Sequence, residues 1–177
     1  MPDDFEVLIT AQEAWPAFEH AVLNSKSEII AGFRIFDLRT KLRSKEAQAI
    51  GQDWFDLIAH VAARGVSFDL TISDFDPVFG TELHEMTWTT MRQGHALKEV
   101  LGHHADKVQI RAHLHPATAG TVPWLAFLPS SLKRQNAALA ELTPSRQARQ
   151  AVQLKRNKLP RMHTVTHHQK LAVIDGE

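Results

Sequence analysis

The sequence predicts an α/β fold, a mixed sheet sandwiched by helices, and two observations lead to this prediction. Segments whose apolar residues recur every three or four positions alternate with segments whose apolar residues recur every second position. The chain has 177 residues, of which 44% are hydrophobic, and this suits one ordinary domain with a buried core. Strands that alternate with helices of this length are typical of layered α/β domains.

The first unit is predicted to be a short strand, a helix and a second strand. Residues 5–9 form a short strand-like run, and Thr10 and Glu13 have the spacing of a capping box that begins a helix. Residues 28–38 are almost continuously apolar, which suits a central strand covered on both faces. Two polar residues interrupt this run, Arg34 and Asp37.

Two further pairs of helix and strand follow. Apolar positions between 54 and 62 have helical spacing, and Gly65 lies where the end of that helix is expected. Residues 66–73 alternate between apolar and polar, which indicates a half-buried strand. The next unit repeats this order, with a helix around 83–101 and an alternating strand over 108–115.

Charge and composition exclude several functional classes. Lys plus Arg total 20 and Asp plus Glu total 20, so no chain-wide field attracts nucleic acid or anionic lipid. The absence of cysteine excludes disulfides, thiol nucleophiles and cysteine-ligated metals. The neutral total is unevenly distributed, because residues 133–161 contain eight basic residues and one acidic residue. This basic segment, about 130–160, is predicted to be helical, and it is either a solvated face or a surface for anionic phosphate groups.

The sequence carries no visible targeting or membrane segment. Acidic residues occupy the N-terminus, where a signal peptide has basic ones. No apolar run approaches the length of about 18 residues that a bilayer-spanning helix needs. We therefore expect a cytoplasmic or peripheral membrane protein.

The strongest chemical signal lies close to the end of the sequence. His168, Lys170 and Asp175 form the pattern His-x-Lys-x4-Asp, in an alternating run that predicts a strand over about 163–175 ending in an Asp-Gly turn. On a strand, His168 and Lys170 share one face and Asp175 points to the other. A neutral imidazole beside an ammonium group suits attack on a phosphodiester, because the imidazole can take the phosphoryl group while the lysine stabilises the phosphate oxygens. Asp175 is better placed to hold the end of the strand.

This pattern resembles the HKD signature of the phospholipase D superfamily. The resemblance extends to residues 7–37, which look like the family's first strand, helix and strand, and to residues 57–77, which look like its next helix, Arg-Gly turn and buried strand. It implies an α/β protein of two similar halves, each of which contributes one HKD motif to a shared site that needs no cofactor or metal. It also implies that His168, Lys170 and Asp175 are catalytic, with one histidine phosphorylated and another protonating the leaving alcohol.

Only one HKD motif is present in the sequence. The resemblance therefore implies that residues 1–177 are the N-terminal catalytic half of a two-motif phosphodiesterase, apparently truncated after the HKD strand and nearly inactive alone. The implied partner is a missing C-terminal half with the second motif, or a second copy in a homodimer. The expected substrate is a glycerophospholipid whose headgroup is hydrolysed or transferred at a membrane surface. Nucleic acid is disfavoured, because no aromatic residues interleave the basic segment as a stacking groove would require.

Several alternatives stay open at this point. The chain is alternatively a nuclease or another phosphodiesterase of the same superfamily, or a non-catalytic binding or scaffold domain. A metal-dependent hydrolase is a further alternative, because His113 and His115 have the same-face spacing of a metal-binding pair on a strand. The plainest alternative is that His168 is an ordinary edge histidine and Lys170 a surface lysine.

A short apolar run before the basic segment has two interpretations. Trp124, Leu125, Phe127 and Leu128 are predicted to belong to the buried core. The other interpretation is an anchor that lies in a membrane interface.

Overall fold

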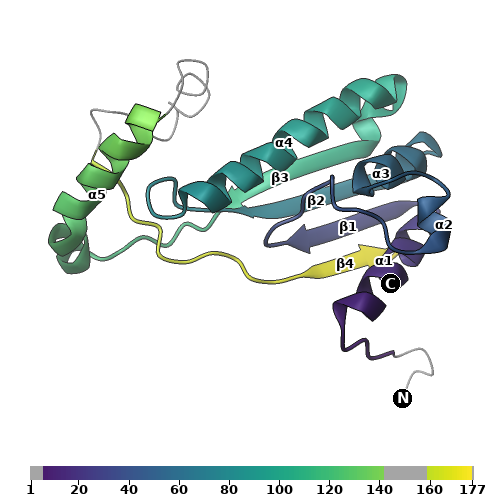
Figure 1. Ribbon diagram of the computed structural model, residues 1–177, viewed down its shortest axis with the longest axis horizontal. Coiled ribbons are helices and arrows are strands. Elements are labelled where there is room, and N and C mark those ends of the chain that lie inside the picture. The colour runs from purple at the N-terminus through teal and green to yellow at the C-terminus, as the bar shows by residue number, and fades with distance from the viewer. Residues whose placement is uncertain (1–5, 142–158, 177) are drawn as a thin grey trace.

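A computed structural model describes residues 6–141 and 159–176, and these confirm the α/β class (Figure 1). The helices are α1 (Ala11–Asn24), α2 (Lys45–Gln48), α3 (Trp54–Ala63), α4 (Thr81–Leu101), the 3₁₀ helix η1 (Gly102–Lys107) and α5 (Thr121–Glu141). The strands are β1 (Glu28–Phe33), β2 (Ser67–Asp74), β3 (Val108–Leu114) and β4 (Leu171–Ile174). Among the described helices, none is both long and apolar enough to cross a membrane.

The four strands form one mixed sheet in the order β3-β2-β1-β4. β1, β2 and β3 are parallel, and β4 runs antiparallel beside β1. The carboxyl ends of the three parallel strands therefore lie at one edge of the sheet, which we call the carboxyl edge. The chain enters β4 from this edge, because Leu171 pairs with Gly32 near the end of β1, whereas Ile174 pairs with Ile29 near its beginning.

The hydrophobic core lies on one face of the sheet. Burial alternates along β1, where Ile29 and Ala31 are buried, and α1, α3 and α4 contribute to the same core cluster. On the opposite face Ile30 is 46% exposed and Leu171 is 53% exposed. The predicted covering of both faces is therefore not found in the described part of the chain. The reason is topological, since right-handed crossovers that step in one direction across a sheet place their helices on the same face.

The helix boundaries follow local signals that the sequence predicted. At the start of α1, Oε2 of Glu13 accepts a hydrogen bond from the backbone N–H of Thr10 (3.0 Å), as the capping-box spacing indicated. The side chain of Asp53, which was not predicted as a cap, caps α3 by accepting from the backbone N–H of Asp56. Just beyond the C-cap of α3 stands Gly65, whose positive φ of 95° suits glycine.

Two predictions for the first unit need correction. Residues 6–9 form no strand and do not join the sheet, and Val7 and Ile9 are 67% and 86% exposed. The strand predicted over 28–38 ends at Phe33. Beyond it the chain leaves the sheet, although the neighbouring β2 continues to Asp74.

The strand predicted over 163–175 is also much shorter. Only β4 pairs with β1, and the residues from 164 to 170 have no regular secondary structure. They reach β4 by passing the carboxyl edge, so they have no neighbouring strand with which to form a ladder. The predicted helix over about 130–160 is seen as the end of α5, and residues 142–158 of it lie outside the described residues.

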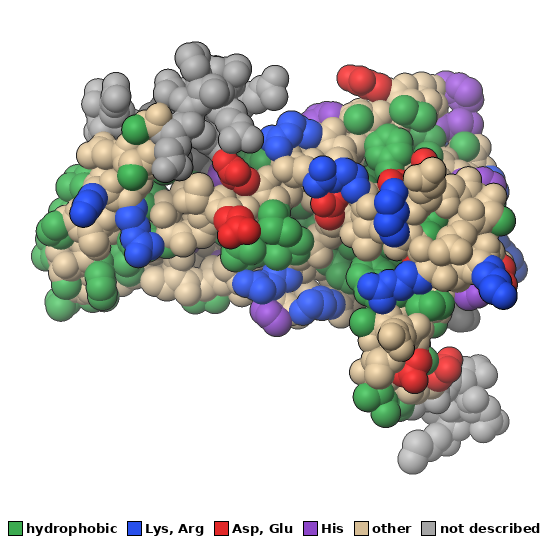
Figure 2. Space-filling view, in the orientation of Figure 1, with side chains coloured by type: hydrophobic (Ala, Val, Ile, Leu, Met, Phe, Trp, Pro, Cys, Tyr) green, Lys and Arg blue, Asp and Glu red, His purple; other side chains and the backbone are tan. Residues whose placement is uncertain are grey.

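α5 stands apart from the sheet, beyond the carboxyl edge (Figure 1). Val122, Leu125 and Phe127 on this helix are 79%, 56% and 54% exposed. Figure 2 shows hydrophobic side chains at the surface of this end of the molecule. The prediction of a buried core role is therefore wrong for Leu125 and Phe127, because the helix does not lie against the sheet.

Candidate active site

Asp175 fastens the end of β4 to the loop that precedes β1. Its carboxylate accepts hydrogen bonds from the backbone N–H groups of Lys26 (2.8 Å), Ser27 (2.7 Å) and Glu28 (3.1 Å), and from Oγ of Ser27 (2.8 Å). The backbone N–H group of Ser27 is the main reason that the pKa of the Asp175 carboxyl lies well below its usual range. Asp175 and Gly176 both have positive φ, at 55° and 89°, as an Asp-Gly turn requires.

We call residues 163–170 the crossing segment, because they run along the carboxyl edge into β4 (Figure 1). The backbone N–H of His163 donates to Oδ2 of Asp76, just beyond β2 (2.8 Å). Oγ of Ser73, near the end of β2, donates to the backbone carbonyl of His167 (2.8 Å). The crossing segment is therefore held to the end of β2 at two points before it reaches β1.

His168 and Lys170 lie between the last of these anchors and the first residue of β4. Both side chains are exposed, and neither forms a hydrogen bond or an ion pair with a described residue. Strand geometry does not set their relative directions, because they precede the β-ladder. What the fold does set is their place, since the bond at His167 and the pairing of Leu171 confine them to the carboxyl ends of β2 and β1.

Besides His163 and His168, three histidine rings lie close together beside the crossing segment or within it. The ring of His167 lies 4.7 Å from that of His115 and 5.9 Å from that of His113, measured between centroids. Nδ1 of His115 accepts a hydrogen bond from the backbone N–H of Ala117 (3.1 Å), which leaves Nε2 as the protonated nitrogen of the neutral ring. In the part of the chain that the structure describes, no three His, Asp or Glu side chains are arranged to hold a metal ion. Within the described residues, no third metal-binding side chain is arranged to complete a site with His113 and His115.

Two buried carboxylates support the carboxyl edge, a role that the local sequence pattern does not reveal. Oδ1 of Asp74 lies 2.6 Å from Nδ1 of His84, and the two side chains are 4% and 2% exposed. Oδ1 of Asp76 accepts from two backbone N–H groups of the turn that follows it (2.8 and 2.9 Å). Two Asp residues and a proline at the end of an alternating run are, by their local pattern, typical of a turn. The sequence feature that belongs to this pair is a histidine near the start of the next helix, His84, ten residues after Asp74.

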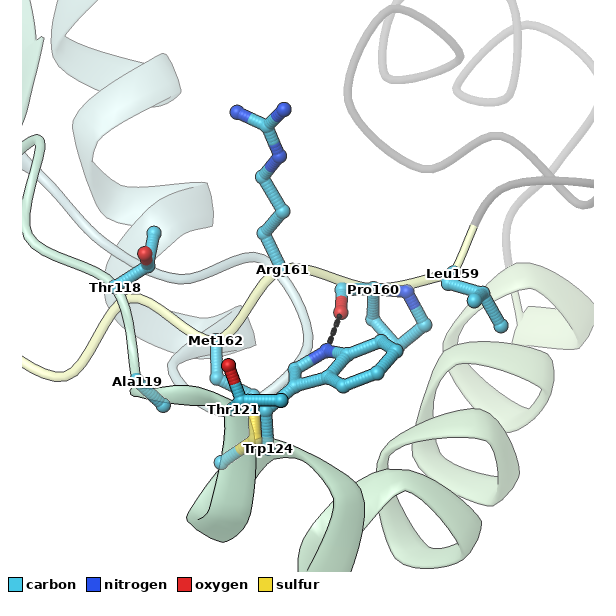
Figure 3. A pocket seen from close by; sticks show the side chains of 8 residues that line it. All are labelled: Thr118, Ala119, Thr121, Trp124, Leu159, Pro160, Arg161 and Met162. Carbon is cyan, nitrogen blue, oxygen red and sulfur yellow. Dashed lines mark hydrogen bonds between the residues drawn. The ribbon is translucent and has the colours of Figure 1, made fainter.

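A hollow of about 450 Å³ lies where the start of α5 meets residues 159–162 (Figure 3). Its lining consists of Thr118, Ala119, Thr121, Trp124, Leu159, Pro160, Arg161 and Met162. Nε1 of Trp124 donates to the carbonyl of Pro160 (2.9 Å), which holds the two sides of the hollow together. Figure 3 shows the only charged side chain of this lining, Arg161, pointing away from Trp124.

No protein-family model matches this sequence, and no curated protein matches it. The likeness to the phospholipase D superfamily therefore rests on the motif and its flanking residues.

Proposed function

We propose that this chain is the catalytic half of a phosphodiesterase of the phospholipase D type, acting on glycerophospholipid headgroups. The observation that carries the proposal is a contrast within the motif. Asp175 is fully engaged in holding β4, whereas His168 and Lys170 are exposed on a backbone that is held on both sides. A reactive pair needs this combination, because it must reach the substrate and still have a defined position.

In the proposed reaction a ring nitrogen of His168 forms a bond to phosphorus while the bond from phosphorus to the leaving oxygen breaks, which gives a phosphohistidine. Lys170 donates hydrogen bonds to the non-bridging oxygens and stabilises their negative charge. A second histidine, supplied by the remaining half or by another copy of the chain, protonates the leaving alcohol. Water or an acceptor alcohol then attacks phosphorus while the second histidine, now neutral, accepts its proton, and the bond from phosphorus to His168 breaks, which completes hydrolysis or headgroup transfer.

The exposed side chains of α5 favour the proposal that the substrate is a lipid at a membrane surface. Val122, Leu125 and Phe127 are exposed, and the cations Lys133 and Arg161 are exposed at the same end of the molecule. Exposed apolar side chains with neighbouring cations are typical of helices that lie in the interface of an anionic membrane. We therefore propose that the protein works as a peripheral membrane protein.

A nuclease of the same chemistry is the second candidate. The basic segment over 133–161 favours it, because clustered cations attract a nucleic-acid backbone as well as anionic lipid. The exposed apolar residues of α5 are the feature that a nuclease would not need.

The chemical proposal can be tested without the second histidine. Bis(p-nitrophenyl) phosphate suits this purpose, since p-nitrophenolate leaves without being protonated. We expect a burst of about one equivalent of p-nitrophenolate per chain, together with a covalent adduct that carries the remaining p-nitrophenyl phosphate ester on the protein. Rapid-mixing absorbance measures the burst, and intact-protein mass spectrometry at neutral or alkaline pH detects the adduct.

Two neighbouring variants give the matched comparison. His168→Ala should abolish both burst and adduct, and His167→Ala should retain them, because His167 contributes its backbone carbonyl to the anchor. A burst that a chelator removes and zinc restores would favour a metal-dependent hydrolase instead. A wild-type chain with neither burst nor adduct would contradict the proposal and favour a scaffold domain.

The lipid assignment has its own test. We expect the chain to sediment with phosphatidylglycerol vesicles and the double variant Leu125→Ser/Phe127→Ser to lose this binding. Val100→Ser is the control, because Val100 is 68% exposed on α4, away from α5. Equal vesicle binding by the double variant, with tight and salt-sensitive binding of a single-stranded oligonucleotide, would favour the nuclease.

A further inference from the structure

Arg34 is a half-buried cation that has no acidic partner among the described residues. It directly follows β1, and its Cζ atom lies 5.3 Å from the ring centroid of Phe75, the residue directly after β2. Its Nε is buried without a hydrogen-bond partner in the described part of the chain. The carboxylates on either side of Phe75 have partners other than Arg34. Asp74 contacts His84, and Asp76 accepts hydrogen bonds from backbone N–H groups.

A cation in this setting is suited to receive an anion. Withdrawing a guanidinium group from water without a counter-ion is costly, and a bound anion removes that cost. The ring of Phe75 holds the guanidinium by a cation–π contact and supplies no negative charge. Arg34 therefore combines a fixed position with an unused capacity to donate hydrogen bonds.

The topology places Arg34 at the same strand ends as His168 and Lys170. The crossing segment is bonded to β2 at His167 and joins β1 where Leu171 pairs with Gly32. The intervening residues 168–170 must therefore pass from the carboxyl end of β2 to that of β1. Arg34 spans the same two strand ends, because it follows β1 and lies over the residue that follows β2.

We propose that Arg34 binds the phosphate group of the substrate together with Lys170. The planar fork of a guanidinium group donates to two phosphate oxygens at once, whereas a lysine acts as a single point charge. A phosphodiester has two non-bridging oxygens, and both remain in place when His168 attacks phosphorus. The inference rests on the proposed function, and it adds to the site a phosphate-binding residue from outside the HKD motif.

Anion binding by the full chain tests this assignment directly. Isothermal titration calorimetry with inorganic phosphate and with tungstate should show about a 10- to 100-fold rise in Kd for Arg34→Met, the loss expected for charge-assisted hydrogen bonds. Methionine keeps an unbranched stem over Phe75 and removes only the guanidinium. Arg34→Lys should have a smaller effect, because it keeps the charge and loses the fork. Arg64→Gln should bind like wild type, since Arg64 lies at the opposite edge of the sheet, where it donates to the carbonyl of Leu23.

The outcomes separate this inference from the proposed function. A His168-dependent burst with anion affinity unchanged in Arg34→Met would overturn the inference and leave the proposed function intact. Arg34-dependent phosphate binding by a chain that shows no burst would support the anion site and contradict the proposed chemistry. A wild-type chain that binds neither anion would overturn the inference. If Arg34→Met fails to fold, Arg34→Lys decides, and a Kd equal to that of wild type overturns it.

Discussion

The two ends of β4 carry parts of one motif, yet they are built in opposite ways. At its carboxyl-terminal end, the Asp175 carboxylate accepts hydrogen bonds from consecutive residues of the loop before β1. At its amino-terminal end, His168 and Lys170 form no hydrogen bond or ion pair with a described residue, although the backbone beside them is anchored. One end of the motif stabilises the fold, and the other keeps its side chains accessible.

This contrast separates two kinds of polar residue at a sheet edge. A carboxylate whose oxygens are occupied by backbone donors contributes to stability and has little capacity left for a ligand. Side chains with unused donors contribute little to stability and can bind a substrate. Substitutions at the two ends of β4 should therefore affect different measurements.

The largest effect is expected from Lys170→Ala, measured as the rate of the p-nitrophenolate burst. Removing a donor that stabilises phosphate oxygens should slow the burst by about 10²- to 10³-fold. The melting temperature should not change, because the side chain is exposed and makes no bond to a described residue. Lys133→Ala on α5 is the charge-matched control. If the burst slowed by less than about tenfold, Lys170 would not be a residue that stabilises the transition state.

The second prediction concerns the buried pair that supports the anchored backbone. His84→Ala leaves the Asp74 carboxylate buried without its partner, and it should lower the free energy of unfolding by about 3–5 kcal/mol. Urea denaturation with an unchanged m-value measures this loss. His104→Ala is the matched control and should change stability by less than about 0.5 kcal/mol. A loss below about 1 kcal/mol for His84→Ala would show that the pair is not a rigid support.

The third and smallest effect is expected from Asp175→Asn, which should lower the melting temperature and leave the burst largely intact. The pKa of Asp175 is lowered by folding, so its stabilising contribution is complete above its ordinary value of 3.8 and is lost as the pH falls through the lower folded value. Thermal melts from pH 7 to pH 2 should show a constant difference between variant and wild type at high pH, which narrows below about pH 4.

Asp37 provides an internal check on this pH dependence. A hydrogen bond from the Arg39 side chain is the main reason that its pKa is lowered to about 2, and it titrates in both proteins. Its contribution therefore cancels in the difference. A structural role for Asp175 would be contradicted if the difference in melting temperature between variant and wild type stayed constant to the lowest pH. It would also be contradicted if Asp175→Asn lost the burst with unchanged stability.

Local pattern was sufficient where a signal lies within a few residues. The alternation over 66–73 predicted β2, the helical spacing between 54 and 62 predicted α3, and the position of Gly65 predicted the end of that helix. Each of these signals depends on side-chain periodicity or backbone conformation, which a short segment determines. The HKD spacing is a signal of the same local kind, and it identified the three candidate residues.

Other features could not be predicted from local pattern because they depend on residues far apart in the sequence. The alternation of residue types predicts a strand for the crossing segment. In the fold this segment has no neighbouring strand, and Ser73 and Asp76 hold it in an irregular path. Arg34 was visible only as a polar exception in an apolar run. Its position over Phe75 depends on how β1 and β2 end side by side.

The sequence thus accounts for the parallel strands, most of the helices and the choice of candidate catalytic residues, because periodicity, caps and motif spacing are properties of short segments. The three-dimensional fold accounts for the face on which the helices lie, the path of the crossing segment and the placement of Arg34 at the carboxyl ends of β1 and β2. These depend on the order of strands in the sheet and on the direction of the crossovers, which bring segments more than a hundred residues apart into contact.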